Sequence, residues 1–243
     1  MKMSYRIEWF DRLSSTNAYM KERFYRNSPP ANGTVFATRD QTAGRGRSER
    51  RWISSPDTNL CFSLFVETDC PLIEVASSTM AAALGITDFL NGRNIAATPK
   101  WPNDVLVGNR KICGILSERV DAPARRGIIV GIGLNVNMSS EEAGAIDRPA
   151  TSMLIETGQA GDLSRTLEEL LPYLKHWIGE WQSGGFPGLR NTWTEKAGPI
   201  GKPLKVHDGA AYKEGTLAGY GNHGELLLQT SRGLETIWSG DVS

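Results

Sequence analysis

The chain has 243 residues, 40% of them hydrophobic and 22% charged, a composition typical of soluble folded proteins and unlike that of disordered or fibrous ones. Lysine plus arginine and aspartate plus glutamate total 27 each, so no global positive field favours nucleic-acid binding. The N-terminus lacks a signal-peptide pattern, and no apolar run approaches the roughly 18 to 20 residues that span a bilayer. Three cysteines without metal-ligand spacing suit a reducing compartment. We therefore expect a cytoplasmic protein without membrane contact.

The first half of the chain alternates strand-like and helix-like segments. Strands are predicted at 5–10, 33–40 and 59–67. Serine and threonine precede a helix-like run within 11–24, where their oxygens can accept the first free N–H groups. A long polar loop is expected at 41–56. Apolar residues at helical spacing predict a second helix at 71–92, with Gly92 at its end.

The second half begins at "KWPND", residues 100–104, which follows the turn-like "AATP". Strands are predicted at 105–107, 111–120 and 127–138. An acidic loop at 139–152 is expected to lead to a helix at 162–181, which Pro172 must either start or kink. The "GGFPG" segment is expected to separate this helix from a short helical piece around Trp193.

The sequence pattern changes beyond Pro199, from helical spacing to short runs separated by turn residues. Four short runs separated by Gly, Asn and Asp predict a small antiparallel barrel of about 45 residues, docked on the main domain because so short a chain folds poorly alone. We expect two domains, 1–196 and 197–243, and the fold class α+β.

Residues 43–52, "AGRGRSERRW", carry the densest chemical signal. Glycines let the backbone approach a ligand, and guanidinium groups match phosphate or carboxylate oxygens. Three interpretations are open: a solvated basic loop, a polyanion-binding loop, and an arm that grips nucleic acid. The neutral overall charge, Glu49 and the lack of interleaved aromatic residues disfavour the last.

Three other motifs each have a structural and a functional interpretation. "STN" at 15–17 is a helix cap or a set of hydrogen-bonding groups for a neutral polar ring. "GIGLNVN" at 131–137 is a buried strand, or a strand whose glycines admit close approach and whose Asn135 and Asn137 share a face. "KWPND" alone is a turn with a snorkelling Lys100.

Together with "RKICGIL" at 110–116, "ATSM" at 150–153 and "GELLL" at 224–228, these motifs in this order resemble the biotin protein ligases. The resemblance runs from about residue 8 to the C-terminus. It implies a central mixed sheet flanked by helices, as in class II synthetases, with a small SH3-like β-barrel domain at the C-terminus. Because the catalytic motifs begin at once, we expect the short form without an N-terminal DNA-binding domain, and no repressor role.

The resemblance also implies the reaction. A biotin protein ligase activates biotin with ATP and Mg²⁺ as biotinyl-5′-AMP and transfers it to a lysine of a biotin carboxyl carrier protein, for example that of acetyl-CoA carboxylase. Bringing two anions together requires fixed positive charge more than a covalent nucleophile. The expected partner is therefore the carrier protein, without nucleic acid or membrane, and the protein is expected to be a monomer or a homodimer.

Site residues follow from the matching motifs. The resemblance implies that Lys100 and Arg47 are catalytic, and that the loop closes over the ligands. It implies biotin contacts from Ser15, Thr16, Asn17, Gln41, Arg45, Gly46, Arg47 and Lys100, and ATP contacts from Arg45, Arg47, Arg50, Lys111 and Asn135. No protein metal ligands are expected. Glu49 stands where the family commonly has glycine, which puts the placement of Arg50 in doubt.

Two alternatives stay open at this point. The enzyme alternative is a lipoate or octanoyl protein ligase, which shares the fold class but lacks "KWPND" together with "GRGR". The alternative from another class is a nucleic-acid-binding module, which requires a strong, salt-dependent affinity for DNA or RNA.

Overall fold

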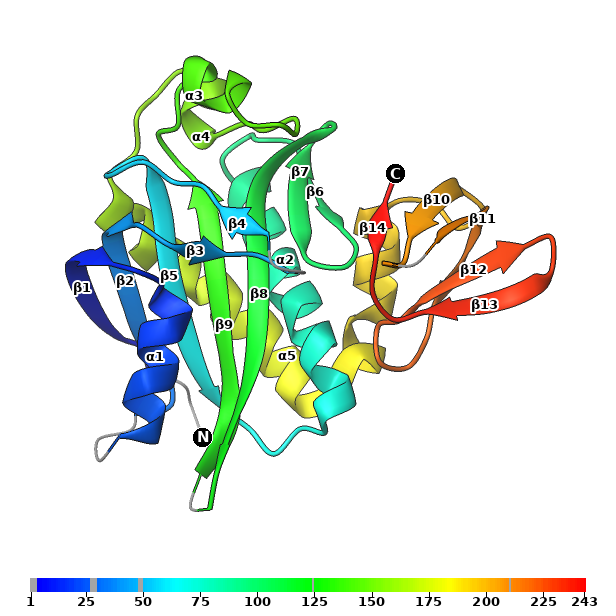
Figure 1. The fold of residues 1–243 in the computed structure, drawn as a ribbon, viewed down its shortest axis with the longest axis horizontal. Coiled ribbons are helices and arrows are strands. Elements are labelled where there is room, and N and C mark those ends of the chain that lie inside the picture. Colours follow the sequence, from blue (N-terminus) through cyan, green and yellow to red (C-terminus); the bar gives the residue numbers. More distant parts are fainter. Residues whose placement is uncertain (1–3, 27–29, 48–49, 124, 210) are drawn as a thin grey trace.

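A seven-stranded mixed sheet forms the centre of the protein (Figure 1). The computed structural model describes residues 4–26, 30–47, 50–123, 125–209 and 211–243. The sheet order is β1-β2-β5-β9-β8-β7-β6, with β1 and β2 parallel and every other neighbouring pair antiparallel. Its strands are β1 (Arg6–Leu13), β2 (Thr34–Gln41), β5 (Asn59–Glu67), β6 (Ala97–Lys100), β7 (Asp104–Val107), β8 (Arg110–Ala122) and β9 (Arg125–Asn135). The predicted mixed sheet is confirmed.

Helices cover both faces of this sheet. α1 (Thr16–Tyr25) packs on one face, over β5 and β9. α2 (Val75–Asn91), which follows the 3₁₀ turn Leu72–Glu74, and the long α5 (Leu163–Ala197) pack together on the other face (Figure 1). The α2 and α5 backbones approach closely at Gly85, where a Cβ would lie 3.0 Å from the Tyr173 carbonyl oxygen.

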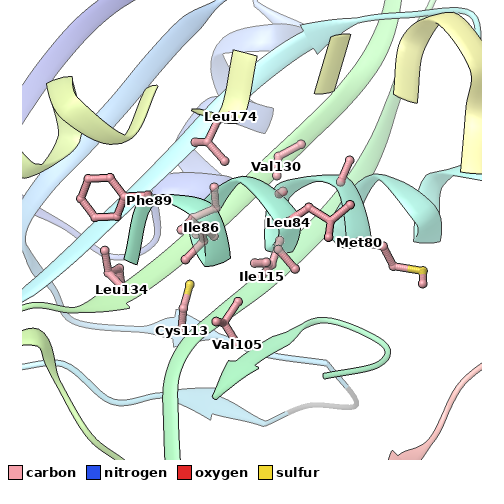
Figure 2. Packing of buried hydrophobic residues seen from close by; sticks show 14 of the residues in the cluster. Met80, Leu84, Ile86, Phe89, Val105, Cys113, Ile115, Val130, Leu134 and Leu174 are labelled. Carbon is pink, nitrogen blue, oxygen red and sulfur yellow. The ribbon is translucent and has the colours of Figure 1, made fainter. Parts of the chain in front are cut away.

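The main core lies between α2 and the sheet, as Figure 2 shows. Met80, Leu84 and Phe89 of α2 are buried against alternate residues of the strands. Those strand residues include Val105, Cys113, Ile115, Val130 and Leu134. Since strand side chains alternate between faces, the residues between them, such as Gly114 and Gly131, point to the α1 face. The face of the sheet that carries these glycines therefore takes no part in the core against α2.

Contrary to the expectation that no apolar run is long enough, one described helical stretch, Leu72–Asn91, could cross a membrane by length and composition alone. Its apolar window is 72% buried inside the protein. It is therefore a core helix, in agreement with the predicted helix at 71–92. The cysteines are free: Cys61 and Cys113 are buried, and Cys70 is partly exposed.

Three segments differ from the predictions. The last three residues of the turn-like "AATP", 97–99, belong to β6. This strand pairs with β7 at the edge of the sheet, where a proline is tolerated because its missing N–H faces outward. The predicted loop at 41–56 contains a short hairpin, β3 (Gly44–Arg45) with β4 (Arg51–Trp52). The predicted acidic loop contains α3 (Ser140–Gly144), which starts with a capping box, and is followed by α4 (Met153–Thr157).

Pro172 neither starts nor breaks α5, which remains helical at that residue. The break lies at Gly185, with φ 59° and ψ −160°, a conformation that favours glycine. The predicted separation at "GGFPG" is therefore confirmed, and α5 consists of two helical parts.

The C-terminal segment forms a five-stranded antiparallel sheet in the order β13-β12-β11-β10-β14. Its strands are β10 (Pro203–His207), β11 (Tyr212–Tyr220), β12 (Leu226–Thr230), β13 (Gly233–Ile237) and β14 (Asp241–Val242). The four predicted runs are confirmed as strands of a small antiparallel sheet domain. This sheet is not closed, because among the described residues β13 and β14 stand at opposite edges and the two-residue β14 pairs with β10 alone. The Trp101 indole N–H donates to the Gly224 carbonyl at 2.9 Å and ties this sheet to the main body.

Candidate active site

A cavity of about 820 Å³ opens on the α1 face of the main sheet, opposite α2 and α5. Its size lies in the range of small-molecule sites. All predicted site residues line it, namely Ser15, Thr16, Asn17, Gln41, Arg45, Gly46, Arg47, Arg50, Lys100, Lys111 and Asn135. Motifs that are up to 120 residues apart in the sequence therefore meet in one place.

One end of the cavity is built from neutral polar groups at the start of α1. Ser15 caps the helix, because its hydroxyl accepts from the Ala18 N–H at 3.4 Å. The Thr16 N–H donates to the Gln41 side-chain oxygen at 2.9 Å, which joins the helix to the end of β2. Ser15 and Thr16 are only 5% and 4% exposed. The cap predicted from "STN" therefore exists, and the same groups also line the cavity.

The glycines of "GIGLNVN" make room for two side chains of the site. A Cβ on Gly131 would lie 2.1 Å from the Asn17 side-chain oxygen, and a Cβ on Gly133 would lie 2.4 Å from the Trp52 ring. The close approach that these glycines predict is thus made here by Asn17 and Trp52. Asn135 ends β9, where it accepts from the Asn59 amide at 2.7 Å and donates to the Thr151 carbonyl at 2.9 Å. Asn137 lies beyond the strand and donates to the Gly161 carbonyl.

The other end of the cavity is cationic. Burial lowers the pKa of the Lys100 amino group, and the Asp104 and Asp241 carboxylates partly oppose this shift. Burial likewise lowers the pKa of the Arg47 guanidinium, opposed by the same two carboxylates. Cations that are removed from water interact more strongly with an anion than solvated ones do. This end is therefore suited to anionic groups.

Each of the other residues of "KWPND" is held by a specific contact. Asn103 donates to the Ile115 carbonyl at 2.7 Å and accepts from Arg47 at 3.2 Å. It therefore links this motif to the arginine-rich stretch at 43–52, called the arginine segment below. The Asp104 carboxylate lies 2.7 Å from the Lys111 amino group. Trp101 is bonded to Gly224, and the Pro102 carbonyl accepts from the Thr79 hydroxyl. Among the described residues Lys100 has no carboxylate within 4.0 Å, so its charge is available to a ligand.

The C-terminal strand supplies a wall of the cavity that the sequence did not predict. Arg50 forms a two-pronged ion pair with Asp241, and Arg148 lies 3.5 Å from the same carboxylate. The hydrogen bonds and charge from Arg50, with those of Arg148, lower the pKa of Asp241. Arg50 and Asp241 are 191 positions apart, so no local pattern links them. Glu49, whose effect on Arg50 was in doubt, lies outside the described residues.

A cavity with neutral hydrogen-bonding groups at one end and desolvated cations at the other is suited to a ligand that joins a small polar ring to an anionic group. A model of the family described as "Biotin/lipoate A/B protein ligase family" matches residues 9–135. The chain is 32% identical over 239 residues to the biotin--[acetyl-CoA-carboxylase] ligase of Paracoccus denitrificans, covering 95% of this chain and 97% of that protein.

Two further comparisons agree. The chain is 30% identical over 245 residues to the bifunctional ligase/repressor BirA of Bacillus spizizenii, covering 99% of this chain and 74% of that protein. The structure of the biotin protein ligase from Aquifex aeolicus in complex with biotin and ATP superposes with a TM-score of 0.78 at 26% identity, covering 98% of this chain and 97% of that one. The chain therefore belongs to the biotin/lipoate A/B protein ligase family, as the motifs predict.

Proposed function

We propose that this protein is an ATP-dependent ligase that activates biotin as biotinyl-5′-AMP and transfers the biotinyl group to a lysine of a biotin carboxyl carrier protein. The observation that carries the proposal is the cavity itself, because it joins the neutral end at 15–17 to the cations Lys100 and Arg47. Biotin has the matching form, a polar ureido ring at one end and a carboxylate at the other.

In the first step a carboxylate oxygen of biotin bonds to the α-phosphorus of ATP, and the bond from that phosphorus to the bridging oxygen of the pyrophosphate breaks. Ser15, Thr16, Asn17 and Gln41 hold the ring at the neutral end. Arg45, Gly46 and Arg47 border the carboxylate and the phosphate, where Lys100 offsets the charge that gathers between the two anions. The protein forms no covalent bond, because the leaving group is already activated.

The nucleotide is assigned to the part of the cavity that borders Arg50, Lys111 and Asn135. In the structure Arg50 is paired with Asp241 and Lys111 with Asp104, so a phosphate competes with a carboxylate for each cation. Mg²⁺ would be held in this region mainly by the phosphate oxygens of the nucleotide and by water, because the nearby carboxylates Asp104 and Asp241 are already paired with Lys111 and with Arg50. The described residues form no cluster of three or more His, Cys, Asp or Glu that would hold a metal by themselves. When bound, Mg²⁺ supplies further neutralisation of phosphate charge.

In the second step the amine of the carrier lysine bonds to the biotinyl carbonyl carbon, loses a proton, and AMP leaves. The arginine segment excludes water from the mixed anhydride until the carrier docks. We assign the catalytic part to a domain of residues 1–196 and the C-terminal sheet to a domain of residues 197–243. We place the protein in the cytoplasm, as a monomer or homodimer, without nucleic acid or membrane as partner.

The isotope exchange between ATP and pyrophosphate tests the first step. Biotin is expected to stimulate the exchange, whereas lipoate and octanoate at the same concentration are not. Stimulation by lipoate or octanoate and not by biotin would assign the protein to the lipoate branch of the family instead.

The lowered pKa of Lys100 predicts a pH dependence. The amino group loses its proton, and with it the charge, at a lower pH than an ordinary lysine. The exchange rate is therefore expected to decline as the pH rises through this lowered pKa. Lys100→Arg, which stays charged throughout, is expected to move that decline to higher pH whatever its absolute rate. If the exchange rates of the two proteins decline over the same alkaline pH range, Lys100 does not cause the decline.

A further inference from the structure

Glu118 links the start of α1 to Arg45, two parts of the cavity wall. It lies on β8 two residues after Leu116 and on the same strand face, next to the residues that line the cavity but not among them. One of its oxygens, Oε2, accepts from the Asn17 amide at 2.9 Å and from the Arg45 guanidinium at 3.1 Å. The other oxygen lies 3.6 Å from the Lys21 amino group. A single carboxylate thus contacts the start of α1 and the arginine segment together.

Glu118 fixes the orientation of the Asn17 amide. The Asn17 Nδ2 group donates to Glu118 and, at 3.1 Å, to the Leu116 carbonyl. An ionised carboxylate and a backbone carbonyl only accept hydrogen bonds. The NH₂ group of Asn17 must therefore face these two acceptors, and its oxygen must face Ser63, whose hydroxyl lies 2.6 Å away.

The orientation of Asn17 also determines which of the Ser63 and Thr16 hydroxyls donates to the other. The hydroxyl of the buried Ser63 has one hydrogen, which the Asn17 oxygen takes. The Ser63 and Thr16 hydroxyl oxygens are nevertheless 2.8 Å apart, a bond that must use the hydrogen of Thr16. The alternative acceptor for that hydrogen, the Gln41 oxygen, is further away at 3.3 Å and already accepts the Thr16 N–H. The Thr16 oxygen therefore presents lone pairs, and no hydrogen, to the cavity.

We propose that Glu118 is a positioning residue that sets the hydrogen-bond polarity of the cavity through Asn17 and Ser63 and holds Arg45 at its mouth. This inference rests on the proposed function. A cavity whose Thr16 oxygen accepts selects a ring with an N–H group, which the ureido ring of biotin has and the dithiolane ring of lipoate lacks. A site that needs an N–H and does not find one leaves a buried polar group unpaired, which is costly.

The role toward Arg45 follows from the donor count. A guanidinium has five N–H donors, and Arg45 uses its Nη2 group to donate to Glu118. The remaining donors stay available at the mouth of the cavity, where the Arg45 side chain is 47% exposed. Glu118 thus restricts a long, otherwise rotatable side chain without using up its hydrogen-bonding capacity.

The test compares Glu118→Gln, Ser63→Ala and the control Glu67→Gln in the biotin-dependent exchange. Glu67 is also a strand carboxylate paired with an arginine, Arg125 at 2.8 Å, but that partner does not line the cavity, whereas the Glu118 partners Asn17 and Arg45 do. Glu118→Gln and Ser63→Ala are each expected to raise the KM for biotin about tenfold with a smaller change in kcat, and Glu67→Gln is expected to match the wild type. A biotin analogue with one ureido N–H replaced by oxygen separates polarity from packing: the wild type is expected to discriminate against it about tenfold, and Ser63→Ala much less.

The outcomes separate the two proposals. A wild-type protein without biotin-stimulated exchange contradicts the proposed function. A wild-type protein that is active, with Glu118→Gln and Ser63→Ala both equal to Glu67→Gln in KM and in discrimination, overturns the role of Glu118 alone. Circular dichroism checks folding, and if Glu118→Gln does not fold, the smaller change Ser63→Ala decides the matter by the same criteria.

Discussion

Lys100→Ala is expected to lower the rate of biotin adenylation by about 10² to 10³, the usual loss when one preorganised charge is removed from a transition state. Lys100 is half-buried in the cavity and has no carboxylate within 4.0 Å among the described residues. Its charge is therefore available to the two reacting anions. The neighbouring Asn103 and Asp104 carry no positive charge, and the nearby cation Lys111 is paired with Asp104, so they do not replace it.

The measurement is single-turnover formation of biotinyl-5′-AMP, with Lys175→Ala as the control. Lys175 lies on the exposed side of α5, outside the cavity, so its removal changes the net charge by the same amount without touching the site. Near-normal adenylation by Lys100→Ala would remove this residue from its assigned role. Asp104→Asn is expected to retain adenylation to a larger extent, because Asp104 holds Lys111 and does not offset the reacting charge.

Gly131→Ala is expected to raise the KM for biotin by at least about tenfold while the protein stays folded. The new methyl group would lie 2.1 Å from the Asn17 oxygen, far inside any real contact, so Asn17 must move. That movement breaks its bond with Ser63 and disturbs the orientation of the whole neutral end. Overpacking of this kind costs about 1–3 kcal/mol of stability, which a domain of this size tolerates.

Gly179→Ala is the matched control, since it adds the same methyl group to α5 where no heavy atom lies within 4 Å. It is expected to leave the KM unchanged and to stabilise the helix slightly. Titration calorimetry with biotin and a thermal melt separate the two effects. An unchanged biotin affinity in Gly131→Ala would mean that the neutral end does not depend on Asn17.

The parts of the fold that the sequence predicted are those with a strong local pattern. The strand at 59–67 is a mostly apolar run and the helix at 71–92 has apolar residues at helical spacing, and hydrophobic burial determines both. Short elements such as β6, β3 and α3 were missed because two to five residues carry too little periodicity. The open edges of the C-terminal sheet could not be predicted, because strand spacing predicts hairpins but not which edge strands meet.

The site residues likewise fall into those that a local motif predicts and those that it does not. The motif residues were found because several lie close together in the sequence, as in "GRGR" and "KWPND". Asp241, Ser63 and Glu118 were missed because each meets its partner only through the tertiary fold, for example Arg45 and Glu118 at a separation of 73 positions. "RKICGIL" did point to β8, and Glu118 follows it by two residues on the same face, a signal that strand alternation makes available.

The transfer of biotin to a carrier protein is the central step of the proposed function. Incubation of the protein with biotin, Mg-ATP and a biotin carboxyl carrier domain is expected to increase the mass of the carrier by one biotinyl group, at a lysine, and only when all three are present. A carrier mass that stays unchanged, under conditions where a known biotin ligase modifies the same carrier, would contradict the proposed function.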